Sequence, residues 1–180
     1  MKSFSINRYH LSFFICFIFL NSCNLFHKNV DPSLPPITME GKNTFGCLVN
    51  GNVWLPKGDL FVPAISADYT SRFLLGFGAS HQSTEPSDFF FSLKNPVSNK
   101  VYSLKDTSVA KAVFDRKLPN QTMSCIYEAY HVFDGSLTIT KFDTKKGIVS
   151  GTFQFSTYNP SCGDTIKVTQ GRFDIGDIAF

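Results

Sequence analysis

The chain has 180 residues, with 17 Lys and Arg against 14 Asp and Glu, and 20 of its residues are phenylalanine. The formal net charge of +3 includes Lys2 and Arg8 near the start of the chain, so the remainder is nearly neutral and gives no indication of a nucleic-acid partner. The aromatic content, with frequent Gly and Pro, favours one β-rich domain over a helical one.

The first 22 residues have the pattern of a secretory signal peptide. Lys2 and Arg8 precede an apolar run from Leu11 to Leu20, which would span about 15 Å as a helix and is too short to cross a membrane. The run ends in Leu20-Asn21-Ser22-Cys23. This ending resembles the bacterial lipobox, although Ala or Ser is commoner where Asn21 stands. The resemblance implies cleavage before Cys23 and anchoring to a membrane by two or three acyl chains.

Residues 23–42 are expected to form a lipid-anchored, flexible tether. Pro32, Pro35 and Pro36 favour extended backbone, and the segment has no hydrophobic periodicity. At about 3.1 Å per residue, such a tether could hold the following domain about 60 Å from the membrane. Because no acidic run follows Cys23, an outer-membrane anchor that faces the periplasm is favoured over display on the cell surface.

Residues 43–180 are predicted to form one all-β domain, either an antiparallel sandwich or a barrel-like meander of about 9–10 strands. Asn50-Gly51 lies between two apolar runs, which predicts a type I′ hairpin with Trp54 just after the turn. Near Gly171 the parity of the apolar positions changes, which predicts a β-bulge.

Two central segments alternate in the manner of strands with one buried face. In one of them Phe89, Phe91 and Leu93 share a face, and in the other Phe73, Leu75 and Phe77 do so. The second segment carries Gly76 and Gly78 on its other face, where they could leave room for a ligand.

Three cysteines remain in the domain once Cys16 and Cys23 are set aside. Cys47 lies in an apolar strand pattern and is expected to be a buried free thiol. Cys125 and Cys162 lie in polar, turn-rich sequence and form the candidate disulfide. The pairing requires the strand over 121–127 to end early, since a strand that ran on to Tyr130 would put Cys125 at the far end of the sheet.

The segments KNTFGCLVNGNVWLP, GSLTITKFDTKKGIVSGTFQF and GDTIKVTQGRFDI resemble a family of small lipoproteins of Bacteroidota, a domain of unknown function. The resemblance implies an all-β domain in the cell envelope and transfers no catalytic residue. The recurrent glycines of that family match Gly51, Gly135, Gly151 and Gly171, each of which has a structural explanation as a turn, strand or bulge glycine.

Two polar constellations are candidates for chemical sites. His81, Glu85 and Asp88 could ligate a cation from one loop, but Pro86 interrupts the run, and a solvated polar loop explains it as well. His131 could pair with Ser124 or Cys125 and with Asp134 in a hydrolase, but no nucleophile elbow is present. The sequence therefore predicts no metal, no cofactor and no catalytic residue.

Aromatic side chains offer a further kind of site. Trp54, Tyr69 and Tyr102 could line a face that binds a sugar or a peptide, although most rings of a Phe-rich β-domain belong to its core. The sequence favours a non-enzymatic envelope domain that binds a small ligand or a partner protein. The alternative is an envelope hydrolase that uses His131 or His81.

Overall fold

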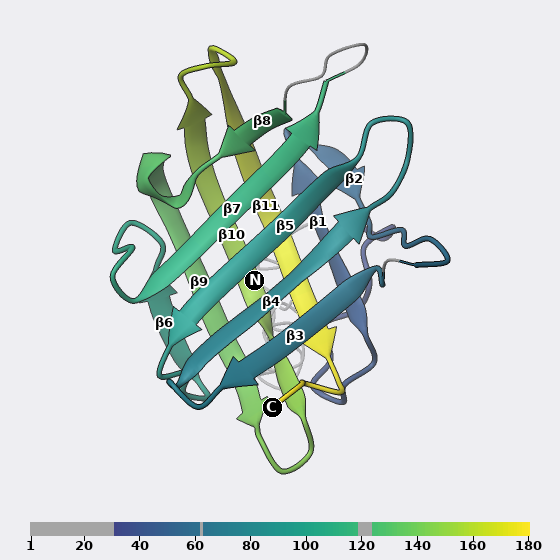
Figure 1. Ribbon diagram of the computed structural model, residues 1–180, viewed down its shortest axis with the longest axis vertical. Helices are drawn as coiled ribbons and strands as arrows, with labels where there is room; N and C mark the ends of the chain where they lie inside the picture. The colour runs from purple at the N-terminus through teal and green to yellow at the C-terminus, as the bar shows by residue number, and fades with distance from the viewer. Residues whose placement is uncertain (1–30, 62, 119–123) are drawn as a thin grey trace, which may run out of the picture. The chain divides into compact units, whose positions relative to one another are not determined.

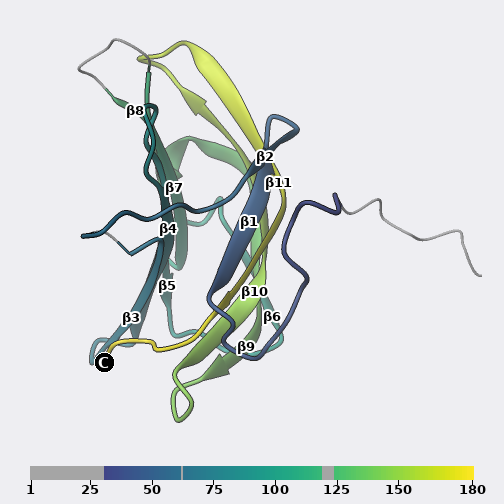
Figure 2. The ribbon, with the colours of Figure 1, turned by 90° about the vertical axis from the view of Figure 1, so that its right-hand side faces the viewer.

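Two antiparallel β-sheets face each other and enclose the hydrophobic core (Figures 1 and 2). The computed structural model describes residues 31–61, 63–118 and 124–180. The predicted signal peptide and Cys23 lie outside the described residues. Within the described ranges, no helix is long and apolar enough to cross a membrane.

The two sheets contain eleven strands among the described residues, and each strand is hydrogen-bonded to the strand named before or after it. The six-stranded sheet consists of β2 (Asn52–Trp54), β1 (Thr44–Val49), β11 (Asp164–Ile175), β10 (Ile148–Asn159), β9 (Val132–Asp143) and β6 (Lys100–Ser103). The five-stranded sheet consists of β3 (Ile65–Thr70), β4 (Leu74–His81), β5 (Ser87–Lys94), β7 (Ala110–Lys117) and β8 (Ser124–Tyr127). The predicted all-β class is confirmed, as a sandwich and with slightly more strands than expected.

Alternation of apolar and polar residues places the core on the inner faces of the sheets. On β5, Phe89, Phe91 and Leu93 are buried, whereas Phe90 points outward and is 51% exposed. On β4, Leu75 and Phe77 are buried as predicted. Phe73 is not on this face, because it belongs to the turn before the strand: its φ is 57°, and its N–H donates to the carbonyl of Thr70 at 2.9 Å.

The turn and the bulge predicted from glycine positions are both present. Asn50 and Gly51 have φ of 50° and 82°, and Val49 pairs with Asn52, as a two-residue type I′ hairpin requires. The bulge lies just before Gly171, where the register of β11 shifts against β1 and β10 and Gln170 has a φ of 53°. Because of this bulge, the apolar residues before it and those after it both point to the inner face of the sheet.

The end of the chain covers one edge of the five-stranded sheet. Ala179 forms a parallel bridge with Asp68 on β3: its carbonyl accepts the N–H of Tyr69 at 2.7 Å, and its N–H donates to the carbonyl of Ala67 at 3.0 Å. An uncovered edge strand is a template for pairing with other chains. The C-terminal residues thus satisfy part of this edge within the molecule.

Cys125 and Cys162 form a disulfide with their Cα atoms 6.1 Å apart. The strand that carries Cys125 ends early, as this pairing requires, because β8 stops at Tyr127 and a 3-10 turn, η2 (Ala129–His131), follows it. Cys47 is a buried free thiol. Burial raises the pKa of the Cys47 thiol, so its reactive thiolate form is suppressed.

The segment expected to be a flexible tether is in part docked on the domain. Residues 33–42 run along the outer face of the six-stranded sheet (Figure 2), and Leu34 is buried there. Residues 33–42 are therefore packed on the domain, and residues 23–30 of the expected tether lie outside the described residues. Four groups of the docked segment are hydrogen-bonded to Asp174, more than 130 positions later in the chain, which local sequence patterns do not reveal.

Candidate functional site

The interior of the sandwich is filled by aromatic rings. The Phe91 ring is fully buried, and its centroid lies 5.0 Å from that of Phe77 and 4.8 Å from that of Phe153. Gly76 and Gly78 do not provide room for a ligand there, since they alternate with the inward-facing Leu75 and Phe77. A Cβ on Gly76 would lie 2.7 Å from a carboxylate oxygen of Asp68 on the neighbouring strand.

The three aromatic residues predicted to share a ligand face lie in different surroundings. Trp54 packs its ring against Phe89 at a centroid distance of 4.8 Å. Tyr69 packs against Phe142 at 5.1 Å. Tyr102 is buried, and its hydroxyl accepts the N–H of Val97 and donates to the carbonyl of Asn95. They do not form one face, because each ring completes the packing of its own part of the sandwich.

Trp54 does, however, form part of a surface cleft at the end of β2, which we call the rim cleft. It has a volume of about 330 Å³ and is lined by Val53, Trp54, Leu55, His81, Ser83, Thr84, Glu85 and Ser87. The indole N–H of Trp54 donates to the Ser87 hydroxyl at 2.9 Å, and the side chain is 9% exposed. The tryptophan thus caps the core, as its position after the hairpin suggests, and contributes to the cleft wall.

His81 is held in the rim cleft through one ring nitrogen. Its Nδ1 lies 2.7 Å from the carbonyl oxygen of Leu55. Because a carbonyl only accepts, Nδ1 is the donor, and in the neutral imidazole Nε2 is then the free acceptor. Lys57 fixes the backbone here: its N–H donates to the carbonyl of Ser80, and its carbonyl accepts the N–H of Gln82.

The loop after β4 supplies the remaining polar groups of the rim cleft. The Ser83 hydroxyl accepts the N–H of Glu85 at 3.1 Å, which shapes the turn that carries both residues. The cleft is therefore lined by Glu85, by the hydroxyl residues Ser83, Thr84 and Ser87, and by Trp54. Acceptors and hydroxyls beside an aromatic surface suit a ligand that carries several hydroxyl groups.

The cation site considered for His81, Glu85 and Asp88 is not assembled. His81 and Glu85 both line the rim cleft, but Asp88 is not among its lining residues and pairs across strands with Ser80 and Asp115. Over the part of the chain that the structure describes, no group of three or more His, Cys, Asp or Glu side chains could hold a metal ion.

The hydrolase constellation around His131 is also not assembled. Cys125 is bound in its disulfide with Cys162. The His131 ring packs edge-on against the Tyr130 ring at a centroid distance of 4.2 Å, and its Nδ1 is buried without a hydrogen-bond partner. Among the described residues, no serine hydroxyl is hydrogen-bonded to His81 or His131. Neither histidine thus has the serine–histidine contact that activates a nucleophile.

A polar cluster lies beside the disulfide. The Asp164 carboxylate accepts the hydroxyl of Tyr127 at 2.6 Å and pairs with the guanidinium of Arg116. Burial, together with the hydrogen bond to Asp164, raises the pKa of Tyr127 to about 12. The phenol therefore stays protonated at neutral pH and keeps donating its hydrogen bond. The cluster has a structural role, because it connects β7, β8 and β11.

Comparisons with known proteins give one match. A family model described as a domain of unknown function, DUF6252, matches residues 83–175, a little over half of the chain. The match begins in the loop of the rim cleft and ends with β11, so it includes Glu85 and leaves out Trp54 and His81. No curated protein and no solved structure matches the chain.

Proposed function

The chain belongs to the DUF6252 family of domains of unknown function, and because that description names no activity, we propose a role from the chemistry of the molecule itself. The protein is a lipid-anchored, non-enzymatic binding module of a bacterial cell envelope, of the kind found in Bacteroidota. It is held in the outer membrane through Cys23 and faces the periplasm. Its ligand is a polyhydroxylated small molecule, such as a sugar, which binds in the rim cleft.

The support for the lipid anchor is the sequence around Cys23, which lies outside the residues that the structure describes. A short apolar run follows a basic start and ends in Leu20-Asn21-Ser22-Cys23, the spacing of a lipobox. Two or three acyl chains would anchor the protein stably, because each buried CH₂ contributes about 0.8 kcal/mol.

Replacing Cys23 by alanine is expected to move the protein from the membrane fraction to the soluble fraction and to abolish acyl labelling. The measurement is fractionation of cells that express either form, combined with metabolic labelling by a fatty acid. Cys16→Ala is the matched control, because Cys16 lies in the segment that the signal peptidase would remove. Unchanged fractionation of the Cys23→Ala variant would refute lipidation.

One observation carries the ligand proposal: the Nδ1 hydrogen bond of His81 holds its ring in a cleft that is also lined by Glu85, three hydroxyl side chains and Trp54. These groups are mostly acceptors or hydroxyls, which match the O–H groups of a sugar. The cleft volume of about 330 Å³ lies at the lower end of the range of small-molecule sites.

The single tryptophan of the chain gives a direct assay for this site. Trp54 fluorescence is expected to change saturably when the protein is titrated with a panel of neutral mono- and disaccharides. Glu85→Gln is expected to weaken the binding about tenfold or more, because it removes a charged acceptor. Glu128→Gln, which makes the same change outside the cleft, is the control and is expected to bind as the wild type does.

Three results would contradict parts of this proposal. A flat titration for the whole panel would overturn the ligand class, and equal effects of the two glutamate variants would overturn the location. Hydrolysis of a bound sugar that is lost in His81→Gln would overturn the non-enzymatic role and support the alternative of an envelope hydrolase.

A further inference from the structure

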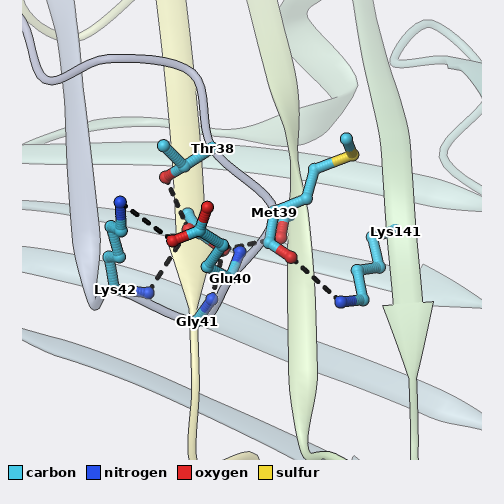
Figure 3. A network of polar contacts seen from close by, with 8 residues as sticks. Thr38, Met39, Glu40, Gly41, Lys42 and Lys141 are labelled. Atoms are coloured by element: carbon cyan, nitrogen blue, oxygen red, sulfur yellow. Dashed lines mark hydrogen bonds and ion pairs between the residues drawn. The ribbon is translucent and has the colours of Figure 1, made fainter.

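Residues 33–42, which we call the strap, bind to the outer face of the six-stranded sheet much as a peptide ligand would. The Asp174 carboxylate on β11 accepts the Thr38 hydroxyl at 2.6 Å. It also accepts the backbone N–H groups of Glu40, Gly41 and Lys42 at 3.0, 2.8 and 3.3 Å. Figure 3 shows Thr38, Gly41 and Lys42 converging on this point. One buried side chain thus holds four groups of the strap.

Asp174 is also supported from within the sheet. It is 1% exposed, and the Ser150 hydroxyl on β10 donates to it at 2.7 Å. Burial disfavours the charged form, but the hydrogen bonds from Thr38, Glu40, Ser150 and Gly41 outweigh it and hold the pKa of Asp174 well below its usual range. The carboxylate is therefore ionised at any pH near neutrality, and the strap is docked under those conditions.

Other contacts fix the remaining length of the strap. The Arg172 guanidinium donates to the carbonyl of Pro35 at 3.3 Å, and Lys141 donates to the carbonyl of Met39 at 2.9 Å (Figure 3). Leu34 is 6% exposed and lies in an apolar recess with Phe45 and Leu55. The strap is thus held mainly through its backbone and by one apolar side chain.

The strap covers charged side chains of β11 as well as an apolar recess. Arg172 and Asp174 belong to the outer face of β11, whereas the adjacent Phe173 belongs to the core between the sheets. If the strap were to leave, water could solvate both charged groups, and the apolar surface uncovered would be the recess that Leu34 shares with Phe45 and Leu55. Detachment therefore does not require the sandwich to unfold.

We infer that the strap is a latch that sets how far the domain can move from its membrane anchor. The inference rests on the proposed lipidation of Cys23. With the strap docked, about ten residues separate the anchor from residue 33 and can span at most about 30 Å. With the strap released, about twenty residues separate the anchor from β1 and can span about 60 Å. Docking thus halves the reach and fixes the point from which the tether leaves the domain.

The latch is tested by amide hydrogen exchange on the full-length protein in its membrane. Asp174→Asn is expected to speed exchange in residues 33–42 about tenfold or more, with the strands of the five-stranded sheet unchanged. Asp134→Asn, a change of the same kind at an exposed position of β9, is expected to leave the strap unaffected. Thr38→Ala removes one contact from the strap side and is expected to give a smaller increase, without altering the sheet. Unchanged strap exchange in both Asp174→Asn and Thr38→Ala would overturn the latch.

The reach is tested separately by energy transfer between a dye on an exposed residue of the five-stranded sheet and dye-labelled lipid headgroups. Asp174→Asn is expected to lower the transfer efficiency relative to the wild type and to Asp134→Asn. Equal efficiency in a membrane-bound Asp174→Asn variant with a released strap would overturn the control of reach. Absence of the wild-type protein from the membrane would overturn the anchor and with it the reach, whereas the exchange result would still decide whether the latch exists.

Discussion

Replacing Phe91 by alanine is expected to lower the free energy of unfolding by about 3–5 kcal/mol. Phe91 is fully buried at the centre of the sandwich and stacks on Phe77 from its own sheet. From the opposite sheet it contacts Phe153 at a centroid distance of 4.8 Å and Phe155 at 6.3 Å. Truncation would remove contacts with both sheets and leave a cavity that rigid neighbouring strands cannot close.

The measurement is equilibrium unfolding in urea, followed by far-UV circular dichroism and by Trp54 fluorescence. Since domains of this size are stable by about 5–15 kcal/mol, a loss of this size would shift the midpoint strongly. Phe90→Ala is the matched control: it removes the same ring from the next position on β5, where the side chain is 51% exposed. A similar loss of stability in the two variants would mean that the assignment of inner and outer faces is incorrect.

The fold could be predicted largely from local patterns in the sequence. The period of two along β5 identifies which phenylalanines are buried, because successive side chains of a strand point to opposite faces. Asn50-Gly51 predicts its hairpin because both residues tolerate the positive φ that the turn demands. Near the edges of elements the local patterns fail: Phe73 fits the alternation of β4, yet its backbone belongs to the preceding turn.

The choice between sandwich and barrel was not predictable, because it depends on which strands fail to pair. β6 is bound to β9 in one sheet and β7 to β5 in the other, although β6 and β7 are adjacent in the chain. Nothing local to Lys100–Ser103 or Ala110–Lys117 indicates that the chain changes sheets between them. Long-range pairing decides the architecture, and short-range periodicity carries no information about it.

The rim cleft and the docking of the strap also depend on long-range contacts that local sequence patterns do not predict. His81 and Glu85 are recognisable in the sequence as a loop pair, but their association with Trp54 depends on the contact of His81 with Leu55, 26 positions earlier. The strap has the sequence of a tether because its prolines and lack of periodicity are typical of extended chain. Its partner Asp174 looks like an ordinary outward-facing polar residue of a strand, and only the folded structure shows that it collects hydrogen bonds from residues 38–42.

Removal of the disulfide by the double change Cys125→Ser and Cys162→Ser is expected to lower the free energy of unfolding by about 4 kcal/mol in the chain-entropy model. The bond spans 37 positions and closes a loop that contains β9 and β10. It joins β8, a four-residue edge strand, to the turn before β11. Two hydrogen bonds hold β8 at the same place. The Asn159 amide donates to the carbonyl of Ile126, and the Asp164 carboxylate accepts the hydroxyl of Tyr127.

Urea unfolding of the double variant against the oxidised wild type measures this loss, and intact mass measured without reductant shows whether the bond is present. The domain is expected to be two hydrogens lighter than its fully reduced form and to contain one thiol, Cys47, that reacts only after unfolding. Reduced wild type is the control, since it breaks the bond without changing a side chain at either position, and it is expected to match the double variant. Equal stability of oxidised and reduced wild type would contradict this prediction, because it would mean that the bond does not raise the free energy of the unfolded chain relative to the native state.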